Sequence, residues 1–541
     1  MANKTKFQAI KGTRDLLPPE TELWNRVEQT AREAFGSFGF GEIRLPIFEP
    51  TQLFARSIGE ETDVVSKEMY TFEDHDLPEL EELKTSLVFR GPNIHEAADV
   101  FSYAQRIKDF QGLVASGLKE KKIVATPDNA WAKDLINVLR TRLLTDADEL
   151  KRGDSLAARR VEIHMESMRG ALGTFRFGSG VALRPEATAS VCRAYIEHGM
   201  QQLPQPVKLY YMGPMFRRER PQKGRYRQFY QIGAEVLEAI TPNQDATKTL
   251  GKDAAVDAEV IEMVMVYFAR LGLEGVVLDI NSIGHSAPEC RRGYVEKLKA
   301  ELEKVKNKLG ADSQRRIETN PLRVLDSKLE SEQSIIEKLP RIGDHLCADC
   351  AKHYAEVKRQ LQLRGVPYQE NWRLVRGLDY YMRTTFEITA QGLGSQNAVC
   401  GGGRYDGLVE LLGGPPTKGI GFAIGEDRVI LSLQEAGKDN MAQGLDVYIA
   451  WMGEKTLATA IRAARDLRQA GFRVELPPVE QKFGKALGQA DKLGARYALI
   501  LGEDEVASGQ WTLKTLADGT QGKYSEEGLM EFLLKTRTVS S

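Results

Sequence analysis

The sequence predicts a mixed α/β (α+β) protein of several domains, in which helical segments interrupt a core of strands. Three observations lead to this fold class. At about 150 residues per domain, a chain of 541 residues divides into three or four domains. Strand-like and glycine-rich segments alternate with two long helical stretches over the first 437 residues. From residue 445 onward, apolar runs alternate with helical patterns, which predicts βαβ units and a mostly parallel sheet.

Composition excludes several classes of protein. The 74 basic and 76 acidic residues give a formal net charge of −2, so any affinity for nucleic acid must come from a local patch. Five cysteines are too few for a disulfide framework and suit a reducing compartment. Neither a signal-peptide core nor an apolar stretch of about 18 residues is present, so we expect a cytoplasmic protein without a membrane span.

The first half of the chain contains a predicted helix, a strand and a helical insertion. Residues 19 to 41 have apolar residues at helical spacing and end in three glycines, and the following EIRLPIFEP reads as a strand. Charge-mixed helical sequence then fills residues 77 to 176 and predicts an inserted helical domain. Residues 285 to 370 predict a second helical domain, in which YVEKLKAELEKVKNKLG is a solvated amphipathic helix.

A strongly basic loop lies between two predicted strands. VKLYYMGPMF and QFYQIGAEVLE, within residues 205 to 238, predict a β-hairpin. Its loop, residues 217 to 227, contains six cations and one acid, Glu219. Guanidinium groups bind phosphate oxygens and nearby aromatic rings can stack on a base, so the loop is a candidate contact to a nucleotide or nucleic acid. A solvated hairpin tip is the alternative interpretation.

Residues 371 to 437 return to strands and glycine turns and end in a helix predicted near 424 to 436. Arg376 precedes Tyr380 and Tyr381. If these side chains are buried, they form a polar pocket with hydroxyl donors; the alternative is an ordinary strand with half-buried tyrosines. The glycine-rich segments match no dinucleotide-binding, P-loop, nucleophile-elbow or metalloprotease motif. The second glycine-rich segment instead reads as a strand that leads into a helix with Arg428. This arrangement lets the backbone and the Arg428 guanidinium approach a ligand closely.

Two cysteines lie close to two histidines in the second helical region. Cys347 and Cys350, with His345 and His353, form the pattern H-x-C-x2-C-x2-H, which could chelate zinc. All four ligands would come from nine residues at the start of a predicted helix, whereas structural zinc sites usually draw two ligands from a distant segment. We therefore expect ordinary reduced thiols and no protein-held zinc.

Taken together, several segments resemble the histidyl-tRNA synthetases, a family of class II aminoacyl-tRNA synthetases. KGTRDLLP with the helix after it resembles motif 1, MGPMFRRERPQKGRYRQFYQIGAEV resembles motif 2, and GIGFAIGEDR resembles motif 3. LVRGLDYYMRTTFE and CGGGRYDGLVE resemble the two signatures peculiar to the histidine enzymes. The likeness covers residues 8 to 76 and 181 to 435, with a looser match over the C-terminal domain.

The resemblance implies a class II synthetase antiparallel sheet flanked by helices, with helical insertions and a C-terminal α/β anticodon-binding-type domain. The implied catalytic core comprises residues 1–76 and 177–284, with motifs 1 and 2, and residues 371–437, with the histidine signatures and motif 3. The implied additions are a lineage-specific helical insertion at 77–176, a helical insertion domain at 285–370 and an anticodon-binding domain at 445–541. By the same resemblance, other members of this family have a short turn in place of the first insertion. Its role stays open between a tolerated surface insertion and a tRNA clamp or partner site.

The implied reaction ligates L-histidine to the 3′ end of tRNA(His) through histidyl-adenylate, with ATP and Mg²⁺ as substrate and counter-ion. Position by position, Arg217 matches the motif 2 arginine at the α-phosphate, and Arg428 matches the motif 3 arginine near the γ-phosphate. Arg376 matches a signature arginine near the α-phosphate and the substrate carboxylate. These three are the expected catalytic residues, because preplaced cations offset the repulsion between a carboxylate and a phosphate. The expected ATP contacts are Arg217, Glu219, Arg225, Phe229 and Arg428.

Further contacts follow from the same resemblance. The expected histidine pocket consists of Glu186, Thr188, Gln231, Glu235, Tyr380 and Tyr381. Such groups can pair with both imidazole nitrogens and with the ammonium. The expected contacts to the tRNA acceptor end are Gln222, Lys223 and Arg225. Two small departures from the family pattern are Ala187, where Gly is common, and the Glu426–Asp427 pair, where Leu-Glu is common.

The resemblance also implies a homodimer through motif 1 and no membrane partner. A non-catalytic synthetase-like regulatory subunit of histidine biosynthesis is the alternative function. Such relatives lack the C-terminal domain and lose catalytic arginines, whereas all of these are present here. A pure tRNA-binding or signalling protein is a third class, which activity with histidine and ATP would exclude.

Overall fold

The computed structural model describes residues 7–59, 62–73, 78–89, 91–93, 95–119, 127–175, 180–240, 246–378, 380–391, 397–439 and 445–538. The chain divides into two compact units, residues 1–16 with 25–438, and residues 17–24 with 439–541. Within the described residues, no helix has the length and apolar composition needed to cross a membrane. The expected domain limits at 76/77 and 176/177 lie outside the described residues.

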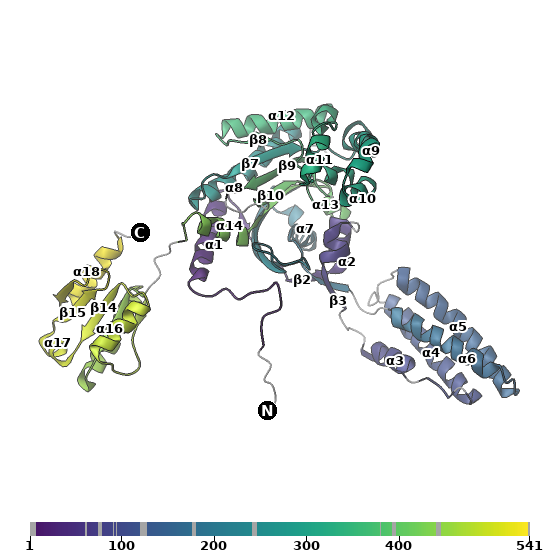
Figure 1. Ribbon diagram of the computed structural model, residues 1–541, viewed down its shortest axis with the longest axis horizontal. Coiled ribbons are helices and arrows are strands. Elements are labelled where there is room, and N and C mark those ends of the chain that lie inside the picture. Colours follow the sequence, from purple (N-terminus) through teal and green to yellow (C-terminus); the bar gives the residue numbers. More distant parts are fainter. Residues whose placement is uncertain are drawn as a thin grey trace. The chain divides into compact units, whose positions relative to one another are not determined.

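The centre of the first unit is an eight-stranded sheet with strand order β1-β5-β6-β11-β10-β9-β7-β8. Figure 1 labels β7, β8, β9 and β10 of this sheet. Its inner pairs are all antiparallel, and the parallel pairs β1–β5 and β7–β8 lie at the two edges. This architecture confirms the antiparallel sheet that the resemblance implied. The strands are β1 Gly41–Glu42, β5 Val207–Phe216, β6 Gln228–Ala239, β7 Val277–Ser282, β8 Gln369–Glu370, β9 Met382–Thr389, β10 Ala398–Arg404 and β11 Thr417–Gly425.

The predicted hairpin is present. Strands β5 and β6 pair antiparallel from Val207 opposite Leu237 to Phe216 opposite Gln228, and the basic loop joins them. Strand β10 carries three consecutive glycines because its neighbours approach it closely. A Cβ at Gly402 would overlap the carbonyl oxygen of Gly421 and the ring of Phe386.

The segment EIRLPIFEP, predicted as one strand, forms two short strands in different sheets. Strand β1 joins the large sheet, and β2 (Phe48–Pro50) joins a three-stranded sheet with β4 (Gly180–Leu183) and β3 (Tyr70–Glu73). Between them, Arg184 donates hydrogen bonds to the carbonyl oxygens of Leu45 at 2.9 Å and Pro46 at 3.1 Å. These carbonyls bind a side chain instead of a neighbouring strand, and proline has no N–H to donate, so the strand is interrupted.

The large sheet is flanked by helices. The apolar positions Val27, Ala31, Ala34 and Phe35 of the first helix are fully buried, as their helical spacing predicts. The helix predicted near 424 to 436 is also present. The bounds are α1 Glu20–Ser37, α2 Thr51–Ile58, α7 Thr188–Glu197, α8 Ala246–Arg270, α13 Leu408–Leu411 and α14 Glu426–Glu435.

Two further groups of helices occur where the sequence predicted them. Within the described parts of residues 78–174, four helices surround a hydrophobic core of their own, with Val100, Ile107, Leu143 and Val161 fully buried. These helices are α3 Pro78–Phe89, α4 Ala97–Lys119, α5 Pro127–Lys151 and α6 Ala157–Thr174. The other group comprises α9 Gly293–Val305, α10 Ala311–Thr319, α11 Glu330–Ile336 and α12 Ala348–Leu363, and α12 packs against α8 (Figure 1).

The second unit contains a five-stranded sheet with strand order β13-β12-β14-β15-β16. Strands β13, β12 and β14 pair parallel, but β14–β15 and β15–β16 pair antiparallel, so the prediction of a mostly parallel sheet is wrong. A parallel pair needs a crossover of about a dozen residues or more, and the connections around β15 are shorter. The elements are β12 Val447–Trp451, α15 Leu457–Gln469, β13 Val474–Glu475, α16 Phe483–Lys492, β14 Tyr497–Leu501, α17 Glu503–Ser508, β15 Trp511–Thr515, β16 Gln521–Tyr524 and α18 Glu526–Thr538.

Candidate active site

A pocket in the first unit collects residues from segments that are far apart in the sequence. They come from the turn before α7, from the β5–β6 hairpin, from the loop before β9, from β10 and from the start of α14. The predicted site residues that line it are Glu186, Thr188, Arg217, Glu219, Arg225, Phe229, Gln231, Arg376, Tyr380, Tyr381 and Arg428. Three predicted residues lie outside the lining: Glu235 is buried behind Thr188, and Gln222 and Lys223 lie on the hairpin loop.

Strand β6 supplies one side of the pocket through its alternation. Successive side chains of a strand point to opposite faces, so Phe229, Gln231 and Glu235 share one face. Across the strand pair, Gln231 lies opposite Gly425, and Glu235 lies opposite Gly421. A Cβ at Gly421 would overlap the carboxylate of Glu235, so glycine is required there to make room for this buried side chain.

Arg217 follows directly after β5. Its Nε donates a hydrogen bond to the carbonyl oxygen of Pro185 at 3.0 Å, and its guanidinium lies 5.5 Å from the centre of the Phe229 ring. Desolvation in the pocket lowers the pKa of Arg217. No carboxylate among the described residues forms an ion pair with it. A desolvated cation without a protein anion is costly, so this position suits an anionic ligand.

Arg376 is held from two sides. Its Nη1 donates to Glu387 at 3.1 Å, and its guanidinium lies 5.7 Å from the centre of the Tyr381 ring. Burial opposes the charge, but Tyr381 and Glu387 outweigh it, so the pKa of Arg376 is raised. The guanidinium lies against Gly401, where a Cβ would overlap it. Its Nε is buried without a hydrogen-bond partner among the described residues, which leaves a donor for a ligand.

Arg428 brings a third guanidinium to the pocket from the first turn of α14. Its Nη1 donates to the carbonyl oxygen of Ala398 at 2.6 Å. Burial lowers the pKa of Arg428, and the positive charges of Arg225 and Arg217 lower it further. Cations that disfavour one another in this way are stabilised by a ligand with several negative charges, such as a polyphosphate.

The opposite end of the pocket is built from buried hydrogen-bonding groups. Glu186 accepts hydrogen bonds from the backbone N–H groups of Thr188 at 2.7 Å and Ala189 at 3.0 Å, at the start of α7. The Thr188 hydroxyl donates to Glu235 at 2.8 Å, and the Tyr405 hydroxyl donates to the other oxygen of the same carboxyl. Burial raises the pKa of Glu186 and raises the pKa of Glu235 to about 8.

The raised pKa of Glu235 predicts that the ligand-free protein loses stability as the pH rises. The ordinary pKa of 4.5 applies to the unfolded chain and about 8 to the folded chain, so between these values the folded chain binds the additional proton. The contribution is fully present below pH 4.5 and is lost as the pH rises through about 8, at up to roughly 1.4 kcal/mol per pH unit. Glu235→Gln cannot ionise and should show a flatter dependence in urea unfolding between about pH 5 and 8.

The exposed Glu197 offers a matched control for this comparison. Glu197→Gln should follow the wild-type pH dependence, because Glu197 lies at the surface and takes no part in the buried network around Glu235. Equal pH dependence in wild type and Glu235→Gln would contradict the assignment.

Comparisons with known proteins agree on one family. Residues 174–429 match the family model described as "Histidyl-tRNA synthetase", and residues 446–536 match "Anticodon binding domain". The chain is 44% identical over 516 residues to the "Histidine--tRNA ligase" of Solibacter usitatus, which covers 95% of this chain and 96% of the relative. This chain belongs to the histidyl-tRNA synthetase family. The "Histidine--tRNA ligase" of Koribacter versatilis is also 44% identical, over 95% of this chain and 93% of the relative.

A solved structure of the same family shares the fold. The crystal structure of apo histidyl-tRNA synthetase from S. aureus is 29% identical, with a TM-score of 0.63. The match covers 98% of this chain and the whole of the solved chain.

The hairpin loop that corresponds to motif 2 of this family is closed by its own contacts. Glu219 forms an ion pair with Arg225, and the backbone of Gln222 exchanges hydrogen bonds with Arg225 at 3.0 and 2.9 Å. Lys223 is exposed and pairs with Glu435 at 2.8 Å, at the end of α14. Gln222 and Lys223 therefore face outward from the loop, while Arg225 and Glu219 line the pocket.

Sequence reasoning missed two residues that organise the site. Glu387 pairs with Arg376, and only the register that places it opposite Gly401 could have revealed this. Asp427 accepts hydrogen bonds from the backbone N–H of Tyr230 at 3.0 Å and from Arg14 at 3.1 Å. Asp427 thus ties motif 1 to motif 2, at a position where the sequence departs from the family pattern.

The pattern H-x-C-x2-C-x2-H does not form one group of ligands. His353 is buried beside Asp257, with 3.4 Å between Nε2 and the carboxylate. Instead, the more distant His285 and Cys290 lie with Cys347 and Cys350. The expectation of no protein-held zinc relied on the lack of a second, distant pair of ligands, and the structure supplies such a pair.

Proposed function

We propose that this protein is a histidine–tRNA ligase, an enzyme that ligates L-histidine to the 3′ end of tRNA(His) in two ATP-dependent steps. The observation that carries the proposal is the convergence of Arg217, Arg376 and Arg428 on one pocket whose other end consists of buried hydrogen-bonding groups. Membership in the family and the 44% identical relatives named "Histidine--tRNA ligase" support this activity over the regulatory alternative. The five free cysteines fit a cytoplasmic enzyme.

In the first step, a carboxylate oxygen of histidine attacks the α-phosphorus of ATP, a P–O bond forms, and pyrophosphate leaves with the electron pair of the broken bond. Both reactants are anionic, so Arg217 and Arg376 at the α-phosphate offset the repulsion and orient the attack. Arg428 holds the γ-phosphate, and Mg²⁺ enters with ATP as its counter-ion. The ring of Phe229 stacks on adenine, and Glu219 and Arg225 are further ATP contacts. No protein nucleophile is required.

In the second step, a hydroxyl of the terminal ribose of tRNA attacks the carbonyl carbon of histidyl-adenylate, and AMP leaves. The outward-facing Gln222 and Lys223, with Arg225, contact the acceptor end. Residues 445–541 bind the anticodon, since unpaired bases can be hydrogen-bonded and stacked by a separate domain. The self-contained core of residues 78–174 supports an insertion that folds as its own domain.

Histidine selection relies on the buried polar end of the pocket. Glu186, Thr188, Gln231, Tyr380 and Tyr381 line it, and Glu235 lies behind Thr188. The Oε1 of Gln231 is buried and has no hydrogen-bond partner among the described residues, so it is ready to accept from the ammonium or the imidazole. Leaving such groups unpaired is costly, which rejects amino acids that lack the matching donors.

The resemblance implies a homodimer through motif 1, and the three-stranded sheet, which lies outside motif 1, offers an exposed apolar face that a second subunit would also cover. The register places Phe48 and Tyr70 opposite Leu183, and Phe72 opposite Val181, so these side chains share one face. Phe48 is 62% exposed and Phe72 is 48% exposed. An apolar face of this kind is typical of a surface that a second subunit covers.

Pyrophosphate exchange into ATP, measured without tRNA and with each amino acid in turn, tests the proposal. We expect exchange with histidine alone, because only histidine pairs with all the buried groups. Exchange with a different amino acid would contradict the substrate, and no exchange with any amino acid would favour the regulatory alternative.

A further inference from the structure

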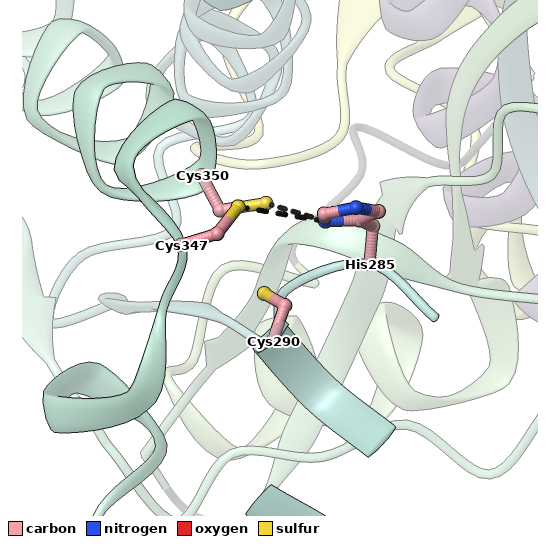
Figure 2. A group of neighbouring side chains, drawn as sticks. All are labelled: His285, Cys290, Cys347 and Cys350. Atoms are coloured by element: carbon pink, nitrogen blue, oxygen red, sulfur yellow. Dashed lines mark hydrogen bonds between the residues drawn. The ribbon is translucent and has the colours of Figure 1, made fainter. Parts of the chain in front are cut away.

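We propose that His285, Cys290, Cys347 and Cys350 bind one zinc ion. The Sγ atoms and one histidine nitrogen all lie within 4.8 Å of one another. Figure 2 shows the thiols of Cys347 and Cys350 pointing toward the His285 ring, with the thiol of Cys290 on the remaining side. Two segments more than fifty residues apart thus supply two ligands each, which is the arrangement of structural zinc sites.

The distances agree with tetrahedral coordination. The Nδ1 of His285 lies 3.2 Å from the Sγ of Cys350 and 3.7 Å from the Sγ of Cys347. With bonds of about 2.3 Å to sulfur and about 2.0 Å to nitrogen, ligand atoms around a tetrahedral zinc ion are about 3.5 to 3.8 Å apart. Small shifts of the side chains therefore suffice to place an ion at the centre.

Local backbone structure brings the ligands together. Cys347 immediately precedes α12 and Cys350 lies in its first turn, so C-x2-C aims both thiols to one side. His285 and Cys290 belong to a turn closed by backbone hydrogen bonds, including Arg291 N–H to the His285 carbonyl oxygen at 3.2 Å. Gly284 has a φ of +64°, and a Cβ there would lie 2.6 Å from the Cys290 sulfur. Glycine is therefore required at this turn.

The donor set selects the metal. Three thiolates and an imidazole are soft or borderline ligands that favour zinc over the oxygen-preferring Mg²⁺ and Ca²⁺. Three thiolates this close repel one another unless a cation lies between them. Cys290 and Cys350 are buried, and four protein ligands leave no open position, so the ion would be structural and not catalytic.

The ion would hold the second helical insertion, residues 285–370, against the histidine pocket. The segment that carries His285 pairs with the chain after Tyr381, through Arg383 N–H to the Gly284 carbonyl oxygen at 2.7 Å. Next to Cys290, the Arg291 side chain donates to the carbonyl oxygen of Tyr381. Binding at the cluster would therefore fix α12 and the backbone behind Tyr381 together, as a positioning element for the pocket.

Metal analysis of the full-length protein tests the proposal directly. We expect about one zinc per chain by mass spectrometry after dialysis against a weak chelator. Replacement by Co²⁺ should give the absorption bands of thiolate coordination. Cys347→Ser combined with Cys350→Ser should reduce bound zinc at least tenfold, whereas the buried Cys192→Ala, outside the cluster, should retain it.

His285→Cys guards against a trivial loss of folding. This variant offers four thiolates and should keep one zinc per chain, while His285→Ala should bind zinc more weakly. Wild-type protein that stays below about a tenth of an ion per chain after addition of Zn²⁺ would overturn the proposal. Retention of zinc by the double serine variant would overturn it as well. So would a thiol titration of the wild-type protein in denaturant that finds two thiols fewer than expected, because those two cysteines would then form a disulfide.

Discussion

Arg376→His should lower the rate of histidine-dependent pyrophosphate exchange by about 100- to 1000-fold, while tRNA affinity changes little. The guanidinium of Arg376 is fixed by Glu387 and by the face of Tyr381, in a niche that Gly401 leaves open. The histidine side chain is shorter than that of arginine and lacks the forked N–H donors of a guanidinium. It therefore cannot span from Glu387 to a ligand in the pocket. The charge that offsets the meeting of carboxylate and α-phosphate would be lost.

The loss should be confined to the chemical step. Exchange kinetics would give kcat and KM for histidine and ATP, and filter binding would give the affinity for tRNA. Arg44→His is the matched control, because Arg44 is 85% exposed and pairs only at the surface with Glu42. Near-normal exchange by Arg376→His would remove Arg376 from the catalytic residues.

Much of the site could be predicted from the sequence because its residues lie in segments with strong local signals. The basic loop between two strands indicated Arg217, Glu219 and Arg225 as candidate contacts, and the family resemblance indicated Phe229, Gln231 and Glu235. Family resemblance supplied the expected roles. None of these signals gives the pairing of β9 with β10, so the partner of Arg376 emerged only from the register.

Features that depend on distant pairing were out of reach for the same reason. A local reading of Cys347 and Cys350 considered the two nearest histidines, whereas the fold brings in His285 and Cys290. In EIRLPIFEP the pattern of apolar residues predicted a strand, but the interruption comes from Arg184, more than a hundred residues later. Local pattern therefore predicts which elements form, and tertiary contacts decide where they stop and what they bind.

The signature CGGGRYDG also contains an arginine, Arg404, with a structural role. Arg404, at the end of β10, is buried and forms an ion pair with the fully buried Asp257 of α8. Asp257 also accepts a hydrogen bond from Thr384 on β9 at 2.6 Å, and His353 of α12 lies 3.4 Å away. Burial lowers the pKa of His353 to about 4, so Arg404 is the cation that compensates Asp257 at neutral pH. This network joins β9 and β10 of the large sheet to helices α8 and α12.

Arg404→Met should destabilise the first unit by about 3 to 5 kcal/mol, because it leaves the buried carboxylate of Asp257 without its compensating charge. The expected result is a lower urea midpoint, with the loss of protection in hydrogen exchange concentrated in β10 and α8. Arg364→Met is the matched control, since Arg364 pairs with Glu262 at 3.1 Å in a partly exposed position and such pairs contribute about 1 kcal/mol or less. Adding Asp257→Leu to Arg404→Met should recover part of the stability, because the unpaired charge is removed together with its partner. An unchanged midpoint for Arg404→Met would mean that water or another cation compensates Asp257 and that the network does not hold the helices to the sheet.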